Sequence, residues 1–307
     1  MVNVGHSYCM SILKIIHIIL VLSVSLSADC VAAMPAFMER AYGPQKRACQ
    51  AGFDKEYVKA GVFTLMTYQR FTPLEKGSSP AGFKALSENI RVYIEGDGRA
   101  WETRGRLSDD PTPSDPVALR LATADSSDNV AYIARPGQFP APDSAGCDPT
   151  YWSARRFAPE VVEAFDRIID MLKIKSGARR VELVGYSGGA AIAVLVASRR
   201  SDVVALRTVA GNLDTKALSA YHQVSQLDGS IDPLDVAQKT AHIPQRHFVG
   251  SKDTIVPSSI AESFVRREGD INFTRITVVS GATHKDGWCE RWKELLSIPL
   301  IPAPQKP

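Results

Sequence analysis

The sequence has no long run of one charge and no cluster in which aromatic residues alternate with basic ones. Lysine and arginine number 36 in the 307 residues, against 33 aspartates and glutamates, which gives a formal net charge of +3. The basic residues form only short pairs such as Arg179-Arg180 and Arg199-Arg200. Nucleic-acid-binding proteins carry a basic face, and single-strand binders add stacking aromatics. We therefore expect no nucleic-acid partner.

Cysteine is scarce, with five residues in the whole chain. Cys49, Cys147 and Cys289 lie beyond the first 33 residues, and their spacing does not fit a metal site. None of them lies in a motif that would activate a thiolate. Three thiols form at most one bridge among themselves, unless Cys30 is also retained. We expect one disulfide or small buried thiols, and neither a metal site nor a catalytic cysteine.

Apolar runs are also short, and one of them lies near the N-terminus. Residues 15–26 follow Lys14 and are interrupted only by His17 and two serines, and a membrane-spanning helix needs roughly 20 residues. Small residues follow this run. The pattern predicts a signal peptide over residues 1–33, cleaved after Ala33.

Two alternatives keep this N-terminal segment on the protein. One is an uncleaved membrane anchor. The other is lipidation of Cys30, although the acidic Asp29 before it fits lipoprotein processing poorly. In either case membrane association would come through the N-terminal segment alone. We expect an exported protein, periplasmic or associated with the envelope.

After residue 34 the chain alternates strand-like and helix-like segments. Strands are predicted at 63–71, 89–94, 129–134, 180–184, 203–209, 247–250 and 275–279, and helices at 159–174, 189–200, 259–267 and 287–296. Strands separated by helices predict an α/β fold with a mainly parallel central sheet and helices on both faces. We expect one domain over residues 34–307, with room for a small cap within 211–243 and a loose proline-rich tail over 298–307.

The most specific motif is Gly185-Tyr186-Ser187-Gly188-Gly189, between an apolar strand and an apolar helix. This pattern is typical of a nucleophile elbow, in which a serine occupies a strained turn and the glycines allow close backbone approach. The Gly188 N–H at the helix N-terminus would stabilise an oxyanion. The alternative interpretation is a tight turn with an incidental serine.

A serine nucleophile needs a base to take its proton and a carboxylate to orient that base. Of the histidines after Ser187, only His284 lies in a turn that follows a late strand and precedes a terminal helix. His222 and His242 fit surface or cap positions, and His247 lies within a predicted strand. His284 is therefore the predicted base.

The predicted acid is Asp253, in the loop after the strand that ends at Gly250. Asp214, in the loop after the preceding strand, is the second candidate. Both carboxylates would also suit a helix cap or a turn, which is the commoner role of aspartate in such loops.

A second oxyanion donor should come from a loop that follows an early strand. The segment 95–98 follows the strand predicted at 89–94, and we place the donor at Asp97, with Gly98 second. A plain turn is an equally good interpretation of this loop. Trp101 and Tyr186 are candidates for the substrate pocket, although large aromatics are more often core residues.

With these residues assigned, the chain resembles the α/β-hydrolase superfamily, and more narrowly a group of small exported or lipoprotein-type hydrolases from proteobacteria. The resemblance spans about residues 51–296. It rests on Tyr93-Ile94-Glu95-Gly96-Asp97-Gly98, Leu107-Ser108-Asp109-Asp110-Pro111-Thr112-Pro113, Tyr151-Trp152, the Ser187 pentapeptide, Ala210-Gly211-Asn212-Leu213-Asp214 and Gly281-Ala282-Thr283-His284. It implies the α/β-hydrolase fold and acyl-enzyme chemistry at Ser187. His284 would act as general base and then acid, with Asp253 orienting it.

The narrower resemblance has one departure. In that group the place of Gly137 often carries a cysteine able to pair with Cys147, and this chain has glycine there. The resemblance to this group does not imply a particular substrate.

The predicted function is hydrolysis of a small carboxylic ester, without a metal or an organic cofactor. A non-catalytic envelope binding protein on the same fold and a serine peptidase are the alternatives. The sequence does not indicate which oligomeric state the protein adopts.

Overall fold

The computed structural model describes residues 36–72, 75–76, 83–84, 87–141, 147–269 and 272–301. The predicted signal peptide, Cys30 and residues 302–307 of the tail lie outside these ranges. Within them, no helix combines the length and the apolar character that crossing a bilayer requires.

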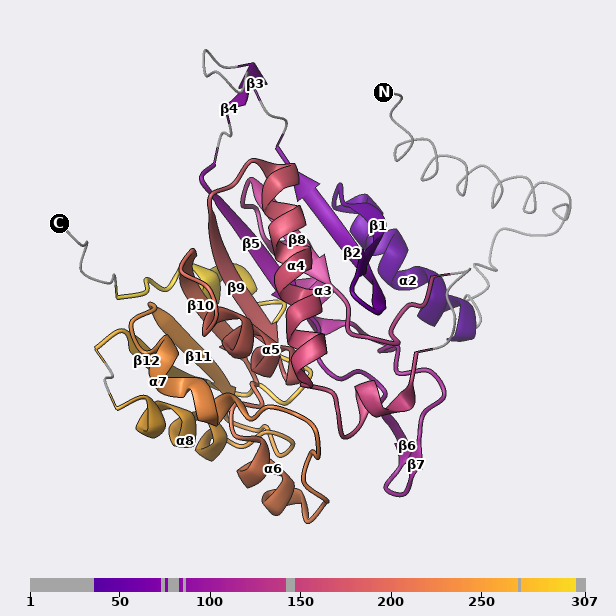
Figure 1. Cartoon of the computed structure of the whole chain (residues 1–307), viewed down its shortest axis with the longest axis vertical. Coiled ribbons are helices and arrows are strands. Elements are labelled where there is room, and N and C mark those ends of the chain that lie inside the picture. The colour runs from indigo at the N-terminus through magenta and orange to yellow at the C-terminus, as the bar shows by residue number, and fades with distance from the viewer. Residues whose placement is uncertain are drawn as a thin grey trace, which may run out of the picture.

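The centre of the protein is an eight-stranded sheet with the order β1-β2-β8-β5-β9-β10-β11-β12 (Figure 1). Its strands are β1 (Asp54–Ala60), β2 (Phe63–Phe71), β5 (Asn89–Ile94), β8 (Asn129–Ile133), β9 (Arg180–Tyr186), β10 (Val203–Val209), β11 (Gln245–Gly250) and β12 (Thr274–Val279). β2 runs antiparallel to both of its neighbours, and the other neighbouring pairs are parallel. The predicted mainly parallel sheet is confirmed.

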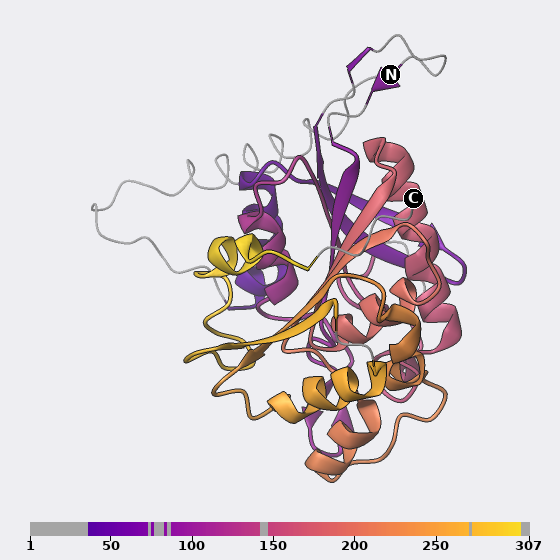
Figure 2. The same ribbon diagram turned by 90° about the vertical axis from the view of Figure 1, so that its left-hand side faces the viewer.

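Helices cover both faces of this sheet (Figure 2). One face carries α4 (Pro159–Ser176), α5 (Gly188–Ala197) and α8 (Ser258–Glu268), and the other carries α2 (Ala36–Gln50), α3 (Val117–Ala124) and α9 (Trp292–Ser297). Alternate strand residues point to opposite faces. Val92 of β5 therefore packs in the apolar cluster under α4, α5 and α8, and Tyr93 packs in the cluster under α2, α3 and α9.

Local sequence explains where α4 begins and ends. Pro159 occupies its first turn, where a missing N–H leaves no hydrogen bond unmade, and Gly177 ends it in a left-handed conformation with φ of 69°. Helix α5 differs because all ten of its residues are buried. It packs against β9 and β10 of the sheet and against α4, and its wholly apolar sequence suits this burial.

Several boundaries differ from the prediction. The last helix begins at Trp292 rather than at residue 287, because Gly287 has φ of +85° and the preceding residues form a turn. Helices α2 and α3 and strand β1 were not predicted. Strand β1 pairs with β2 through a tight turn, so tertiary pairing rather than apolar alternation defines it.

A hairpin and a short helix lie at the carboxyl ends of the parallel strands. The hairpin of β6 (Trp101–Thr103) and β7 (Arg106–Leu107) and helix α6 (Thr215–His222) lie at this end (Figure 1). The hairpin of β3 (Glu75–Lys76) and β4 (Phe83–Lys84) lies at the opposite end. The polar stretch 211–243 contains α6 together with η2 (Pro233–Val236) and α7 (Ala237–Thr240).

The three cysteines beyond residue 33 form no disulfide with one another. Cys49 is in a disulfide, whereas Cys147 and Cys289 are free thiols, and burial raises the pKa of both thiols to about 11. Gly137 has φ of +80°, and a Cβ there would lie 2.7 Å from the ring of Trp152. A cysteine at position 137 therefore does not fit this backbone without displacing Trp152.

Candidate active site

Ser187 occupies the turn between β9 and α5 in a strained conformation, with φ of 50° and ψ of −119°. Its N–H donates to Val209 O at 2.9 Å, which ties the turn to β10. A Cβ on Gly185 would overlap the backbone of α5, and one on Gly189 would overlap the backbone at the end of β5. Both glycines are therefore required, and the geometry is that of a nucleophile elbow.

His284 lies between Ser187 and Asp253. Its Nε2 is 3.0 Å from Ser187 Oγ, and its Nδ1 is 2.9 Å from Asp253 Oδ2. The Asp253 side chain is fully buried, and the His284 side chain is 14% exposed. Asp253 Oδ1 accepts the N–H groups of Ile255 and Val256, both at 2.9 Å, so Oδ2 faces the imidazole. The three predicted residues thus form one hydrogen-bonded chain.

Two aromatic residues hold the His284 backbone in place. Tyr186 Oη and Trp288 Nε1 both donate to His284 O, at 3.1 and 3.0 Å. The Tyr186 ring lies 5.4 Å from the imidazole, measured between centroids. Tyr186 was predicted to line the pocket, but it lies buried beside the histidine and positions it.

The other candidates have different roles. Asp214 caps α6 by accepting from Ala217 N at 2.9 Å, and it also accepts from Ser263 Oγ. His247 is buried in β11, and burial lowers its pKa to about 3. His222 ends α6, where its Nε2 is 2.7 Å from Ile255 O.

The loop after β5 passes directly over the nucleophile. A Cβ on Gly96 would lie 3.2 Å from Ser187 Cβ, and one on Gly188 would overlap the carboxylate of Asp97. The two predicted oxyanion donors, Gly188 and Asp97, are therefore neighbours. A Cβ on Gly98 would instead overlap Pro111 O, which places Gly98 against a different segment.

The Asp97 side chain forms an ion cluster with Arg135 and Arg156. Asp97 Oδ1 is 3.2 Å from Arg135 Nη1, and Oδ2 is 2.7 Å from Arg156 Nη1. Burial by itself would raise the pKa of Asp97, but the two guanidinium groups outweigh it and lower that pKa below its usual value. Burial lowers the pKa of Arg135 to about 10, so both groups carry charge at neutral pH.

Glu95 fixes the start of the same loop from inside the protein. Its fully buried carboxylate accepts the N–H groups of Gly96, Ala118 and Leu119, which join the loop to the first turn of α3. Burial raises the pKa of Glu95 to about 7, and these three bonds partly oppose that rise. Gln138 adds a further tie, because its Nε2 donates to Gly96 O at 2.9 Å.

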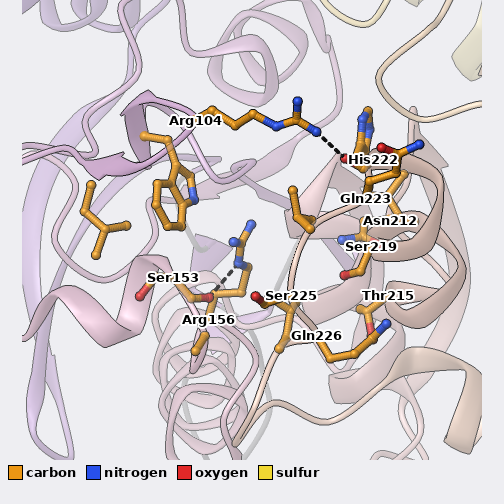
Figure 3. Close-up of a pocket in the computed structure, with 16 residues that line it drawn as sticks. Arg104, Ser153, Arg156, Asn212, Thr215, Ser219, His222, Gln223, Ser225 and Gln226 are labelled. Carbon is orange, nitrogen blue, oxygen red and sulfur yellow. Dashed lines mark hydrogen bonds between the residues drawn. The ribbon is translucent and has the colours of Figure 1, made fainter.

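A cavity of about 660 Å³ lies near this site, although Ser187, His284 and Asp253 are not among its lining residues (Figure 3). It lies between the β6–β7 hairpin and α6, and Trp101 is one of its lining residues. Asn212 and Arg156 connect it to the nucleophile. Asn212 N donates to Ser187 O at 3.0 Å, and Arg156 binds Asp97.

Several solved structures share this architecture. An alpha-beta serine hydrolase homologue from Coxiella burnetii is 17% identical, with a TM-score of 0.51, and the match covers 79% of this chain and 93% of that one. A Pyrococcus furiosus esterase is 15% identical, with a TM-score of 0.54 and coverage of 81% and 91%. The chain has the α/β-hydrolase fold.

A puromycin-hydrolyzing peptidase from Mycobacterium tuberculosis shares the α/β-hydrolase fold with this chain. It is 15% identical, with a TM-score of 0.55, and the match covers 80% of this chain but only 37% of the peptidase. Neither protein-family models nor curated proteins match the sequence. At these identities the likeness establishes the α/β-hydrolase fold alone.

Sequence reasoning missed three residues of this candidate site. Arg135, Arg156 and Asn212 come from three different segments. Asn212 lies in the 210–214 motif that carries part of the resemblance, but no sequence feature assigned a role to any of the three. The nearest signal was position. Arg135 and Asn212 both follow strands whose carboxyl ends meet at this edge of the sheet.

Proposed function

We propose that the protein is a serine hydrolase that cleaves a carboxylic ester through an acyl-enzyme on Ser187. The observation that carries the proposal is the position of His284, within hydrogen-bond distance of both Ser187 Oγ and Asp253 Oδ2. A serine hydroxyl is a weak nucleophile at neutral pH, and this chain of groups supplies the base and its orienting carboxylate.

In the first half of the reaction, Ser187 Oγ attacks the ester carbonyl while its proton passes to His284 Nε2. The carbonyl oxygen becomes an oxyanion that accepts the backbone N–H groups of Gly188 and Asp97. The C–O bond to the alcohol then breaks, and His284 gives the proton to the departing oxygen. Asp253 holds the imidazole in the required tautomer and stabilises its protonated form.

In the second half, His284 takes a proton from water, whose oxygen attacks the acyl carbon. The bond from that carbon to Ser187 Oγ breaks, and the proton returns to the serine. The protein supplies every group used in these steps, so the proposed reaction needs neither metal nor organic cofactor.

Labelling by a fluorophosphonate probe tests the proposal directly. We expect labelling of the wild type, and hydrolysis of a short-chain nitrophenyl ester, that both disappear in Ser187→Ala. Ser201→Ala is a matched control, because Ser201 is exposed and precedes β10, at the end of the strands opposite Ser187. An unlabelled, folded wild type would reject the hydrolase proposal in favour of a binding protein.

Ester and peptide hydrolysis require a separate comparison. An ester hydrolase should release nitrophenol from aryl esters but not nitroaniline from peptide anilides. Release from the anilides at a comparable kcat/KM would instead identify a peptidase.

We further propose that residues 1–33 direct export, which places the enzyme in the periplasm or at the envelope. Cell fractionation of the full chain and of a chain lacking residues 2–33 tests this. The full chain should fractionate with the periplasm or the envelope and the shortened chain with the cytoplasm. Identical distributions would contradict the proposal.

A further inference from the structure

The charged residues that line the cavity between the β6–β7 hairpin and α6 are all basic. Arg104 and Arg156 are among the residues that line it, and none of the described lining residues is acidic. The carboxylate of Asp97 offsets the charge of only one guanidinium in its cluster with Arg135 and Arg156. The carboxylates of Asp214 and Asp232 also lie behind the α6 wall. The excess of positive charge therefore belongs to the described lining itself, which has a formal charge of +2, one from each arginine.

Arg156 is held so that part of its guanidinium is available to a ligand. Its Nη1 donates to Asp97 Oδ2 at 2.7 Å and its Nε to Ser153 O at 2.8 Å, and the side chain is 15% exposed. Within the described residues, its Nη2 has no hydrogen-bond acceptor. Figure 3 shows the guanidinium lying among the residues that surround the cavity. These bonds fix its position in advance, which lowers the entropy cost of binding an anion.

Arg104 approaches the cavity from the opposite wall. It lies in the turn between β6 and β7, and its Nη2 donates to His222 O at 3.2 Å (Figure 3). This bond joins the hairpin to the end of α6. The cavity is thus lined by one arginine that Asp97 and Ser153 hold in place and by a second, exposed arginine on the hairpin.

A buried amide adds a neutral polar group. Asn212 is 6% exposed and lines the cavity, and its Oδ1 has no hydrogen-bond partner among the described residues. Ser219 and Thr215 line the same wall, and each is 6% exposed. The Asn212 oxygen is an acceptor, so it needs an O–H or N–H donor from a ligand or a water, and the anionic group itself would bind the guanidinium groups instead.

We infer that this cavity binds a negatively charged oxygen group of the substrate, so that the preferred ester carries a carboxylate or a phosphate. Guanidinium groups bind such groups through charge-assisted, often bidentate hydrogen bonds. Trp101, which lines the cavity and is 46% exposed, would cover the connecting carbon atoms. The inference rests on the proposed ester hydrolysis and specifies its substrate class.

Two pairs of model esters separate the effect of charge from that of size. One pair places the charge on the acyl side, as 4-nitrophenyl hydrogen adipate and its methyl ester. The other places it on the alcohol side, as 4-acetoxybenzoate and its methyl ester. In at least one pair we expect kcat/KM to be about tenfold or more higher for the charged member, at low ionic strength.

Arg104→Gln should remove most of this preference, measured as the ratio of kcat/KM between the charged and the neutral member. Arg104→Lys should retain part of the preference, because it keeps the charge but not the planar fork. Arg179→Gln is the matched control, since Arg179 is exposed and precedes β9, at the end of the strands opposite the cavity. It should leave the preference unchanged.

Calorimetric binding to Ser187→Ala gives a measurement that does not depend on turnover. The charged member of the discriminating pair should bind about tenfold more tightly than its neutral partner, and Arg104→Gln in the same background should remove that difference. Competition by benzoate and by phenyl phosphate then shows which anion the cavity prefers.

The two proposals fail separately. Equal kcat/KM and equal affinity for the charged and neutral members of both pairs would overturn the anion site and leave ester hydrolysis standing. Charge-dependent binding to Ser187→Ala without turnover of any ester by the wild type would support the anion site and overturn the hydrolase proposal.

Discussion

The carboxylate of Asp97 lies directly against Cα of Gly188, so that a Cβ at position 188 would overlap Asp97 Oδ1. This contact joins the two loops that would stabilise an oxyanion. It also explains the glycine directly after Ser187 in a way that the elbow alone does not. The elbow requires small residues at 185 and 189, and the Asp97 contact requires one at 188.

Gly188→Ala should therefore reduce activity by displacing the 95–98 loop. Loss of one oxyanion donor typically costs about 10²- to 10³-fold in kcat, and we expect a loss approaching that range. Steady-state kinetics with an aryl ester measures it, and circular dichroism checks the fold. Gly105→Ala is the control, because a Cβ at that position meets no atom within 4 Å. Full activity in Gly188→Ala would show that the loop tolerates the shift.

The identity of the catalytic acid is tested by two substitutions that separate the candidates. Asp253→Asn should lower kcat by about 10⁴-fold, because the amide favours the wrong imidazole tautomer. Asp214→Ala should instead lower the free energy of unfolding by about 1 kcal/mol through loss of the α6 cap, with less than about a tenfold change in kcat. Enzyme kinetics and urea unfolding of both variants measure these effects. The reverse pattern would assign Asp214 as the acid.

Glu95 should make stability depend on pH. Folding raises its pKa from 4.5 to about 7, so the folded protein holds this proton more tightly than the unfolded chain does. Its contribution to stability is fully present below about pH 4.5 and is lost as the pH rises through about 7. At about 1.4 kcal/mol per pKa unit, the loss is on the order of 3 kcal/mol.

Urea unfolding between about pH 4.5 and 8 compares the wild type with Glu95→Gln, which cannot ionise there. The stability of Glu95→Gln relative to the wild type should increase across this range. Glu290→Gln is the control, because Glu290 is exposed, and its curve should run parallel to that of the wild type. A parallel curve for Glu95→Gln would contradict the prediction.

Gly137 should not accept the cysteine that the narrower resemblance associates with this position. Its positive φ, and the Trp152 ring that would lie 2.7 Å from an added Cβ, predict a loss of about 1–3 kcal/mol for both Gly137→Cys and Gly137→Ala. Thermal unfolding measures this loss, and thiol titration should find Cys147 still free in Gly137→Cys. A stable variant with a new disulfide would show that Trp152 moves easily.

The sheet was predictable because its central parallel strands are apolar runs and because helix α4 has a regular apolar spacing. Strands 203–209 and 129–133 needed no tertiary information. Strand β1 and helix α3 were missed because their conformation depends on pairing with β2 and on packing against the sheet. Gly287 shows the same limit at a boundary, since its positive φ is set by the turn that carries His284.

The sequence by itself determined the glycine-flanked turn at Ser187 and the order of Ser187, Asp253 and His284 along the chain. This was possible because glycine spacing and chain order are local, steric properties. Only the tertiary structure decided that Asp214 caps α6, that Tyr186 supports His284, and that Arg135 and Arg156 share Asp97. Those roles depend on which loops lie next to one another at the edge of the sheet, and long-range packing determines that arrangement.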